Sequence, residues 1–171
     1  MIGILAIQGG VEEHEAVLQS LGLPFKRVRS LQDVGGLTGL ILPGGESTVM
    51  RLFLKEYGLE EWLKQQTFPI YGTCAGLIVL SALGLLNVQV ERNAYGRQSA
   101  SFVADLDVKG LGVLKGHFIR APKIVEVGEG VEVLAEYQGV PVLVRQGNVW
   151  ASSFHPELAE EGQLHAHIFM C

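Results

Sequence analysis

One stretch of the sequence decides the fold: Pro69-Ile-Tyr-Gly-Thr-Cys-Ala-Gly-Leu77. Its first half is typical of a buried strand that ends at Gly72, and a helix is expected to begin near Ala75. The five residues from Gly72 to Gly76 fit the G-x-nucleophile-x-G elbow, which holds a nucleophile on a sharp turn at the carboxyl end of a strand. The two glycines leave room for neighbouring backbone, and the helix turns free N–H groups and its positive dipole end toward the thiol. This context favours a reactive Cys74 over a buried structural cysteine.

Outward from this elbow, the first half of the chain alternates strand and helix patterns. Strands are expected at Ile2–Ile7, Phe25–Arg29, Leu40–Leu42 and Pro69–Gly72, and helices at Val11–Leu21, Ser47–Tyr57, Glu60–Gln66 and Ala75–Leu83. This alternation predicts an α/β fold with a mostly parallel central sheet and helices on both faces.

The second half of the chain is richer in strand patterns. They cover Asn87–Glu91, Ser101–Ala104, Val113–Ile119, Ile124–Val127, Val133–Tyr137, Val142–Arg145 and Val149–Phe154. Short turns at Glu129-Gly130 and Gln138-Gly139 predict hairpins, and a last helix is expected from about Glu160 to Met170. The sheet should therefore be mixed.

Length and composition exclude several classes of protein. The 171 residues favour a single domain over 1–171, and 48% hydrophobic with 18% charged residues indicates a compact fold. A net charge of -5 argues against a nucleic acid or an acidic membrane as partner. The two cysteines, Cys74 and Cys171, form no disulfide framework, which fits a reducing compartment. With no signal peptide and no apolar run long enough to span a bilayer, we expect a cytoplasmic protein.

A candidate base for Cys74 lies in Ser153-Phe-His-Pro-Glu157, directly after the last strand. His155 and Glu157 are two positions apart, so in an extended chain they point to the same side. His155 could activate the thiol and protonate a leaving group, while Glu157 accepts from the other ring nitrogen. Alone, this segment is equally consistent with a surface turn. Together with the elbow, it predicts a Cys-His-Glu triad.

The remaining histidines give no sign of a metal site. His14 lies among glutamates on a predicted helix and is expected to be solvated, and His117 falls in a strand. His165 and His167 are two apart, which does not place them on one helix face. No Cys, His or carboxylate set has the spacing of metal ligands, so we expect no metal.

A second glycine turn precedes a helix in Leu40-Ile-Leu-Pro-Gly-Gly-Glu-Ser-Thr48. Ser47 or Thr48 is expected to cap that helix. The turn could be an ordinary helix entry, or the N–H of Gly45 could hold an oxyanion together with the N–H of Ala75. The phosphate-loop pattern and G-x-G-x-x-G are both missing, so no nucleotide cofactor is expected.

Taken together, these motifs resemble the class I (triad) glutamine amidotransferases, and more closely the glutaminase subunits of pyridoxal 5'-phosphate synthases. The segments that carry the resemblance are Leu5-Ala-Ile-Gln-Gly9 with Glu13-His14, Leu42-Pro-Gly-Gly-Glu-Ser-Thr48, Gly72-Thr-Cys-Ala-Gly-Leu-Ile78, Glu91-Arg-Asn-Ala-Tyr-Gly-Arg-Gln98, Phe118-Ile-Arg-Ala-Pro122 and Ser153-Phe-His-Pro-Glu-Leu158. The resemblance runs from Met1 to about Leu158, and it implies a three-layer, flavodoxin-like sandwich.

The resemblance also implies a reaction and a set of site residues. L-glutamine would be hydrolysed to L-glutamate and ammonia without a cofactor, and a partner synthase subunit would use the ammonia to make pyridoxal 5'-phosphate. Cys74, His155 and Glu157 would be catalytic, with Gln8 near the oxyanion site at the synthase interface. Glutamine would be bound by Gly45, Glu46, Ser47, Arg92, Ile119 (through its backbone) and Arg120. An arginine suits an α-carboxylate, although an isolated surface arginine is by default an ion-pairing residue.

Three alternatives remain at the level of sequence. The chain could be the glutaminase subunit of another triad amidotransferase, such as one of histidine biosynthesis. It could belong to the related cysteine-elbow proteins of the deglycase and stress-protein type, which generally lack a His-Pro-Glu triad. It could also be a binding subunit that has lost catalysis.

Overall fold

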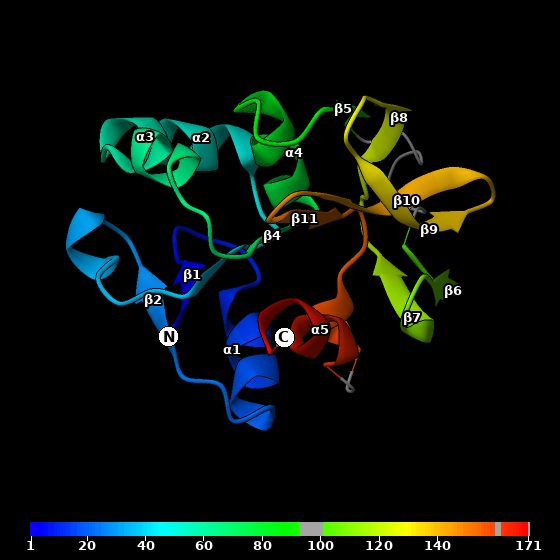
Figure 1. Cartoon of the computed structure of the whole chain (residues 1–171), viewed down its shortest axis with the longest axis horizontal. Coiled ribbons are helices and arrows are strands. Elements are labelled where there is room, and N and C mark those ends of the chain that lie inside the picture. The colour runs from blue at the N-terminus through cyan, green and yellow to red at the C-terminus, as the bar shows by residue number, and fades with distance from the viewer. Residues whose placement is uncertain (93–100, 160–161, 171) are drawn as a thin grey trace.

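A seven-stranded sheet forms the centre of the molecule, here a computed structural model that describes residues 1–92, 101–159 and 162–170 (Figure 1). Across the sheet the order is β2 (Phe25–Val28), β1 (Ile2–Leu5), β3 (Gly39–Leu42), β4 (Ile70–Thr73), β11 (Val149–Ser152), β10 (Val140–Gln146) and β9 (Glu132–Tyr137). The first five strands are parallel, and β10 and β9 continue the sheet as antiparallel strands. The expected mixed, mostly parallel sheet is confirmed.

Helices cover both faces of this sheet (Figure 1). On one face lie α2 (Ser47–Glu56), α3 (Leu59–Lys64) and α4 (Ala75–Ala82), and on the other α1 (Val11–Ser20) and α5 (Gln163–Phe169). Strands β1, β3, β4 and β11 are buried at every residue. Parallel strands that are covered on both sides need such continuous apolar runs, which is why the sequence marked them clearly.

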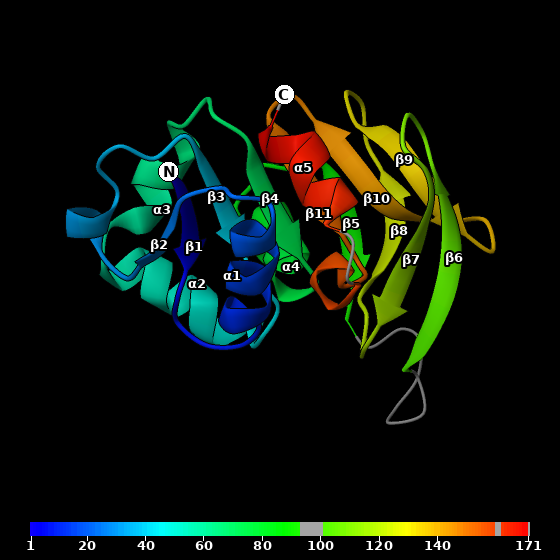
Figure 2. The ribbon, with the colours of Figure 1, turned by 90° about the horizontal axis from the view of Figure 1, so that it is seen from below.

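Two small sheets lie beside the antiparallel end of the main sheet (Figure 2). One pairs β5 (Val88–Glu91) with β8 (Lys123–Val127), and the other pairs β6 (Phe102–Val108) with β7 (Gly112–Phe118). The hairpin predicted at Gln138-Gly139 is confirmed, since this turn joins β9 to β10. The hairpin predicted at Glu129-Gly130 is wrong, because β8 and β9 belong to different sheets.

The ends of a few elements differ from expectation. Helix α2 is capped by Glu46 rather than by Ser47 or Thr48: its carboxylate accepts a 2.9 Å hydrogen bond from the Thr48 N–H. A glutamate can do this because its longer side chain folds back over the first helical turn. Helix α5 begins at Gln163, while residues 160–161 lie outside the described chain. Within the described chain, no helix is long and apolar enough to cross a membrane.

The strand order determines where the site can form. Strand β4 lies between β3 and β11, and all three run in the same direction. Their carboxyl ends therefore meet at one edge, where the residues that follow them come together. These are the glycine turn after β3, Cys74 after β4 and His155 after β11.

Candidate active site

Cys74 lies on the elbow that the sequence predicted, between β4 and α4. Its backbone has φ 52° and ψ -103°, a conformation that L-residues rarely adopt. The turn is fixed on one side by a 2.9 Å hydrogen bond from the Cys74 N–H to the carbonyl of Ser152 in β11. On the other side, a Cβ at Gly76 would lie only 2.2 Å from the carbonyl oxygen of Leu42. Helix α4 can therefore start this close to β3 only with glycine at position 76.

His155 and Glu157 are hydrogen-bonded to each other. The His155 Nδ1 and Glu157 Oε1 atoms are 2.5 Å apart, and His155 is anchored by a 2.8 Å bond from its N–H to the His117 carbonyl in β7. Glu157 lies in a short 3-10 turn, η2 (Pro156–Leu158), so the two side chains meet through a turn rather than along the extended chain that the sequence suggested. Because the carboxylate only accepts, Nδ1 carries the proton, which leaves Nε2 as the ring nitrogen available to Cys74.

The charge of His155 depends on these two partners. Burial lowers the pKa of His155, but its hydrogen bonds to Cys74 and Glu157 and their negative charges outweigh that effect and raise the pKa to about 10. An imidazolium next to a thiolate is the form expected of an activated cysteine. The three residues expected to form the triad thus lie together, and His155 lies between Cys74 and Glu157.

The glycine turn after β3 faces this pair closely. A Cβ on Gly44 would lie 2.6 Å from His155 Cε1 and 3.6 Å from Cys74 Cβ. The Gly44 carbonyl accepts a 3.3 Å hydrogen bond from the Gly10 N–H, which ties the turn to the start of α1. Gln8 lies against Gly45, since a Cβ at that glycine would be 3.5 Å from Gln8 Cγ.

A cavity of about 460 Å³ opens above Cys74. Its lining includes Gly45, Glu46, Ser47, Cys74, Ala75, Arg92, Ile119, Arg120 and His155, which are most of the residues expected to act on or bind a substrate. Gln8 instead lines a neighbouring cavity of about 240 Å³, and Glu157 lies behind His155. The cavity is therefore lined by the thiol of Cys74, the imidazole of His155, one carboxylate and two guanidinium groups.

Two of the cavity's polar side chains, those of Arg92 and Glu46, have defined surroundings. A 3.3 Å hydrogen bond from Arg92 Nη1 to Thr48 Oγ1 holds this guanidinium beside the start of α2. The Thr48 N–H, with a smaller contribution from Arg92, lowers the pKa of the Glu46 carboxyl, which stays charged near neutral pH. Arg120 has φ 45°, a left-handed backbone conformation, and it lies two residues after the end of β7 at Phe118. Residues 93–98 of the predicted Arg-Asn-Ala-Tyr-Gly-Arg-Gln motif lie outside the described chain.

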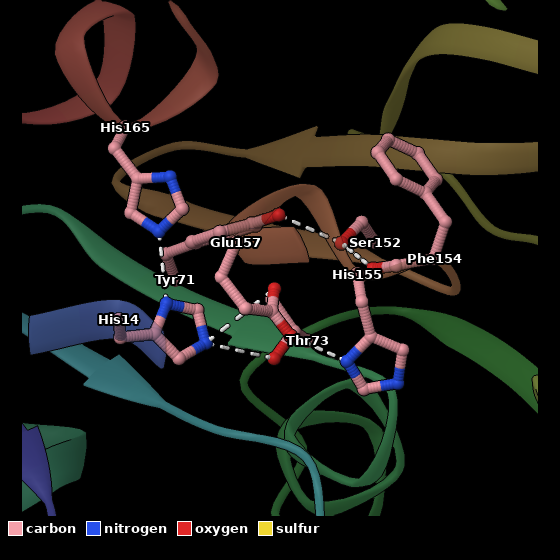
Figure 3. A network of polar contacts seen from close by, with 8 residues as sticks. All are labelled: His14, Tyr71, Thr73, Ser152, Phe154, His155, Glu157 and His165. Carbon is pink, nitrogen blue, oxygen red and sulfur yellow. Dashed lines mark hydrogen bonds and ion pairs between the residues drawn. The ribbon is translucent and has the colours of Figure 1, made fainter. Parts of the chain in front are cut away.

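Two buried histidines behind Glu157 were missed by the sequence reasoning (Figure 3). His14 is fully buried, so the expectation that it is solvated is wrong. Its Nδ1 lies 2.8 Å from Nε2 of His165, which is also fully buried. The signal was present: Val11, His14 and Leu18 follow the spacing of a buried helix stripe, and the glutamates between them occupy the other face. Within the described residues, no group of three or more His, Cys, Asp or Glu could hold a metal ion.

Comparison with known proteins gives a consistent picture. Residues 4–171 match the SNO glutamine amidotransferase family. The chain is 50% identical over 181 aligned residues to the pyridoxal 5'-phosphate synthase subunit PdxT of a strain of Thermus thermophilus, covering 98% of this chain and 95% of that protein. It is 46% identical to the PdxT subunit of Methanocaldococcus jannaschii, covering 95% and 92% of the two chains.

Solved structures agree with the fold. A crystal structure of a glutamine amidotransferase superposes with a TM-score of 0.93 at 46% identity, covering 99% of this chain and 97% of that one. The structure of PurLQS from Thermotoga maritima matches with a TM-score of 0.73 at 19% identity over 98% and 96% of the chains, and at that identity it supports the fold alone.

Proposed function

The chain belongs to the SNO glutamine amidotransferase family, and from this premise we propose that it hydrolyses L-glutamine and delivers the ammonia to a synthase partner that makes pyridoxal 5'-phosphate. One observation carries the proposal. Cys74, on its strained elbow, lies close to His155, whose Nδ1 is 2.5 Å from Glu157, and Cys74 and His155 line one cavity of about 460 Å³.

The reaction follows from these positions. The thiolate of Cys74 adds to the side-chain amide carbon of glutamine, and the carbonyl electrons move onto oxygen. The N–H groups of Gly45 and Ala75 stabilise that oxyanion, with Gln8 beside Gly45. His155 gives its Nε2 proton to the departing nitrogen, ammonia leaves, and a γ-glutamyl thioester remains. Water, deprotonated by His155, then cleaves the thioester to glutamate and restores the thiol.

The rest of the cavity suits the amino-acid end of glutamine. Arg92 and Arg120 provide guanidinium groups for the α-carboxylate, since this pairing is planar and bidentate. The charged Glu46 carboxylate is on the same lining for the α-ammonium group. Ser47 and the backbone of Ile119 complete the proposed set, since both line the cavity.

The partner and compartment belong to the same proposal. The curated relatives are named as subunits of a synthase, which implies a second subunit that receives the ammonia. Cys74 is a free, half-buried thiol, and a thiol nucleophile must stay reduced to act. We therefore place the reaction in the cytoplasm, as part of a complex with the synthase subunit.

Glutamate release from glutamine tests the proposal. We expect the native chain with the synthase subunit to release glutamate, and Cys74→Ala with the same partner to be slower by at least about a thousandfold. A chloroketone analogue of glutamine should add its mass to Cys74 and leave Cys171 unmodified. A native complex no faster than the Cys74→Ala complex, or labelling of Cys171 alone, would refute the assignment.

A further inference from the structure

The outer oxygen of the Glu157 carboxylate, Oε2, is buried behind His155 and does not line the substrate cavity. While Oε1 bonds His155, Oε2 has no hydrogen-bond partner within normal distance and is buried. His14 Nε2 lies 3.7 Å from this oxygen and is within hydrogen-bond distance, 3.4 Å, of Thr73 Oγ1. Figure 3 shows His14 between Glu157 and His165, so three side chains from η2, α1 and α5 lie in one row.

The row has a definite direction of donation. Burial lowers the pKa of His14 well below its usual value and that of His165 to about 4, so both rings are neutral at pH 7 and each carries one N–H. In the 2.8 Å contact between them, either His165 Nε2 donates to His14 Nδ1 or the reverse holds.

The two arrangements differ in cost. If His14 donated from Nδ1, its Nε2 lone pair would face the Glu157 carboxylate, and His165 Nδ1–H would be a buried donor without a partner. If His165 donates, His14 carries its proton on Nε2, toward Glu157 and Thr73, and His165 Nδ1 is only an unused acceptor. The second arrangement removes a repulsion and an unsatisfied donor, and a buried unpaired donor is expensive.

We propose that His14 is a positioning residue for the triad: His165 fixes its tautomer, and its Nε2–H is directed at the outer oxygen of Glu157. This role rests on the proposed glutaminase function. The row would extend the triad to Cys74, His155, Glu157, His14 and His165, with the last two acting through Glu157 and touching no substrate.

The other titratable groups around the Glu157 carboxylate show what the N–H of His14 contributes there. The groups that face its carboxylate are His155 beside it, His14 from α1, and Tyr71 from β4, whose own pKa is raised by burial and by Glu157. Glu13 also approaches, since its Oε2 and Glu157 Oε1 both lie within 4 Å of the Cβ position of Gly10. Tyr71 is neutral, so His14 supplies the favourable dipole that keeps Glu157 able to support a charged His155.

The tautomer can be measured without any mutation. Long-range ¹⁵N–¹H NMR of the full chain, labelled on its histidine rings, distinguishes Nε2–H from Nδ1–H. We expect His14 and His165 both to be neutral at pH 7 with the proton on Nε2. A proton on Nδ1 of His14 would overturn the proposal, and so would a charged His14.

Variants test whether the donor matters to the triad. His14→Leu keeps bulk but removes the N–H, whereas His14→Gln keeps an amide N–H near the position of Nε2. In the leucine variant we expect the NMR titration of His155 to fall by about one pH unit, and the pH profile for alkylation of Cys74 by iodoacetamide to shift with it. With the synthase present, kcat should fall about tenfold with KM within about twofold, and the glutamine variant should recover most of the loss.

Two further variants complete the test: one is a control on the same helix as His165, and the other replaces His14→Leu if that variant does not fold. His167→Phe removes a half-buried histidine that lies on the same helix as His165 but packs on Trp150, so its His155 titration should match the native one. If His14→Leu does not fold, His165→Phe, which keeps a ring beside Tyr71, should still lower the His155 titration by releasing the tautomer of His14. A folded His14→Leu or His165→Phe with a native titration of His155 overturns the proposal.

Absence of glutamine hydrolysis in the native complex would instead refute the proposed function, because the tautomer and the titration are measured without glutamine.

Discussion

At the scale of single residues, the backbone of Cys74 carries a conformation that its side chain disfavours. A φ of 52° with ψ of -103° costs an L-residue about 1–3 kcal/mol. The strain persists because the Cys74 N–H is bonded to β11 and α4 starts immediately afterwards. Its effect is to hold the thiol in the lining of the cavity, which it shares with His155.

This strain predicts an unusual order of stability among variants. Cys74→Ala keeps the strained φ, whereas Cys74→Gly relieves it, so we expect the glycine variant to be about 1 kcal/mol more stable than the alanine variant after the entropy cost of glycine. Urea unfolding of both proteins measures the difference. Ala75→Gly, one residue on and already helical, should instead lose about 1 kcal/mol. An alanine variant more stable than the glycine variant would show that the elbow stores no strain.

At the scale of elements, the site depends on how closely α4 packs on the sheet. The helix carries buried residues on most of its surface, and Gly76 in its first turn lies directly against Leu42 of β3. This contact brings the helix N-terminus, with its free N–H groups, to the end of β4.

The contact also makes Gly76 sensitive to a single methyl group. In Gly76→Ala the new Cβ would meet Leu42 backbone at 2.2 Å, so α4 must move away from β3. We expect a loss of about 2–3 kcal/mol in the free energy of unfolding, with lower Cys74 reactivity because the elbow moves with the helix. Gly35→Ala is the matched control: nothing lies within 4 Å of its Cβ position, and its stability should change by less than about 0.5 kcal/mol. Equal losses in the two variants would contradict this account.

At the scale of the whole molecule, two neutral histidines from opposite ends of the chain meet in the interior. His14 and His165 are 151 positions apart, and both are fully buried between α1, α5 and the sheet. Burial lowers the pKa of both, to about 4 for His165 against an ordinary value of 6.5. Between the lowered pKa values and the ordinary value of 6.5, these two histidines are therefore neutral in the native protein and protonated in the unfolded chain.

This difference predicts acid sensitivity in a defined window. Above pH 6.5 neither state protonates His165, and its contribution to stability is complete. As the pH falls from 6.5 toward 4, only the unfolded chain takes up the proton, so native stability decreases, by up to about 3 kcal/mol from His165 and further in the same direction from His14.

Urea unfolding measured from pH 7.5 to 4 checks this expectation. The His165→Phe variant should lose less stability across the window than the native chain, because it lacks the group that titrates differently in the two states. His167→Phe should follow the native slope. Parallel curves for the native chain and His165→Phe would rule out a neutral buried His165.

The sequence by itself determined the order of the elements, the elbow and the pairing of His155 with Glu157. These features depend on short-range signals: apolar runs mark the buried strands, glycines at 72 and 76 mark the elbow, and the histidine and its carboxylate are two positions apart. Each follows from neighbours within a few positions, where steric limits and periodicity act.

Only the tertiary structure decided which distant groups meet. Glu129-Gly130 has the composition of a hairpin turn, yet β8 pairs with β5, because pairing depends on which strand edge the closed fold offers. The stripe of Val11, His14 and Leu18 marks the buried face of α1, but only the closed fold places His165 of α5 against His14. Contacts across 151 residues depend on how all the layers close together, and no local pattern in the chain encodes that closure.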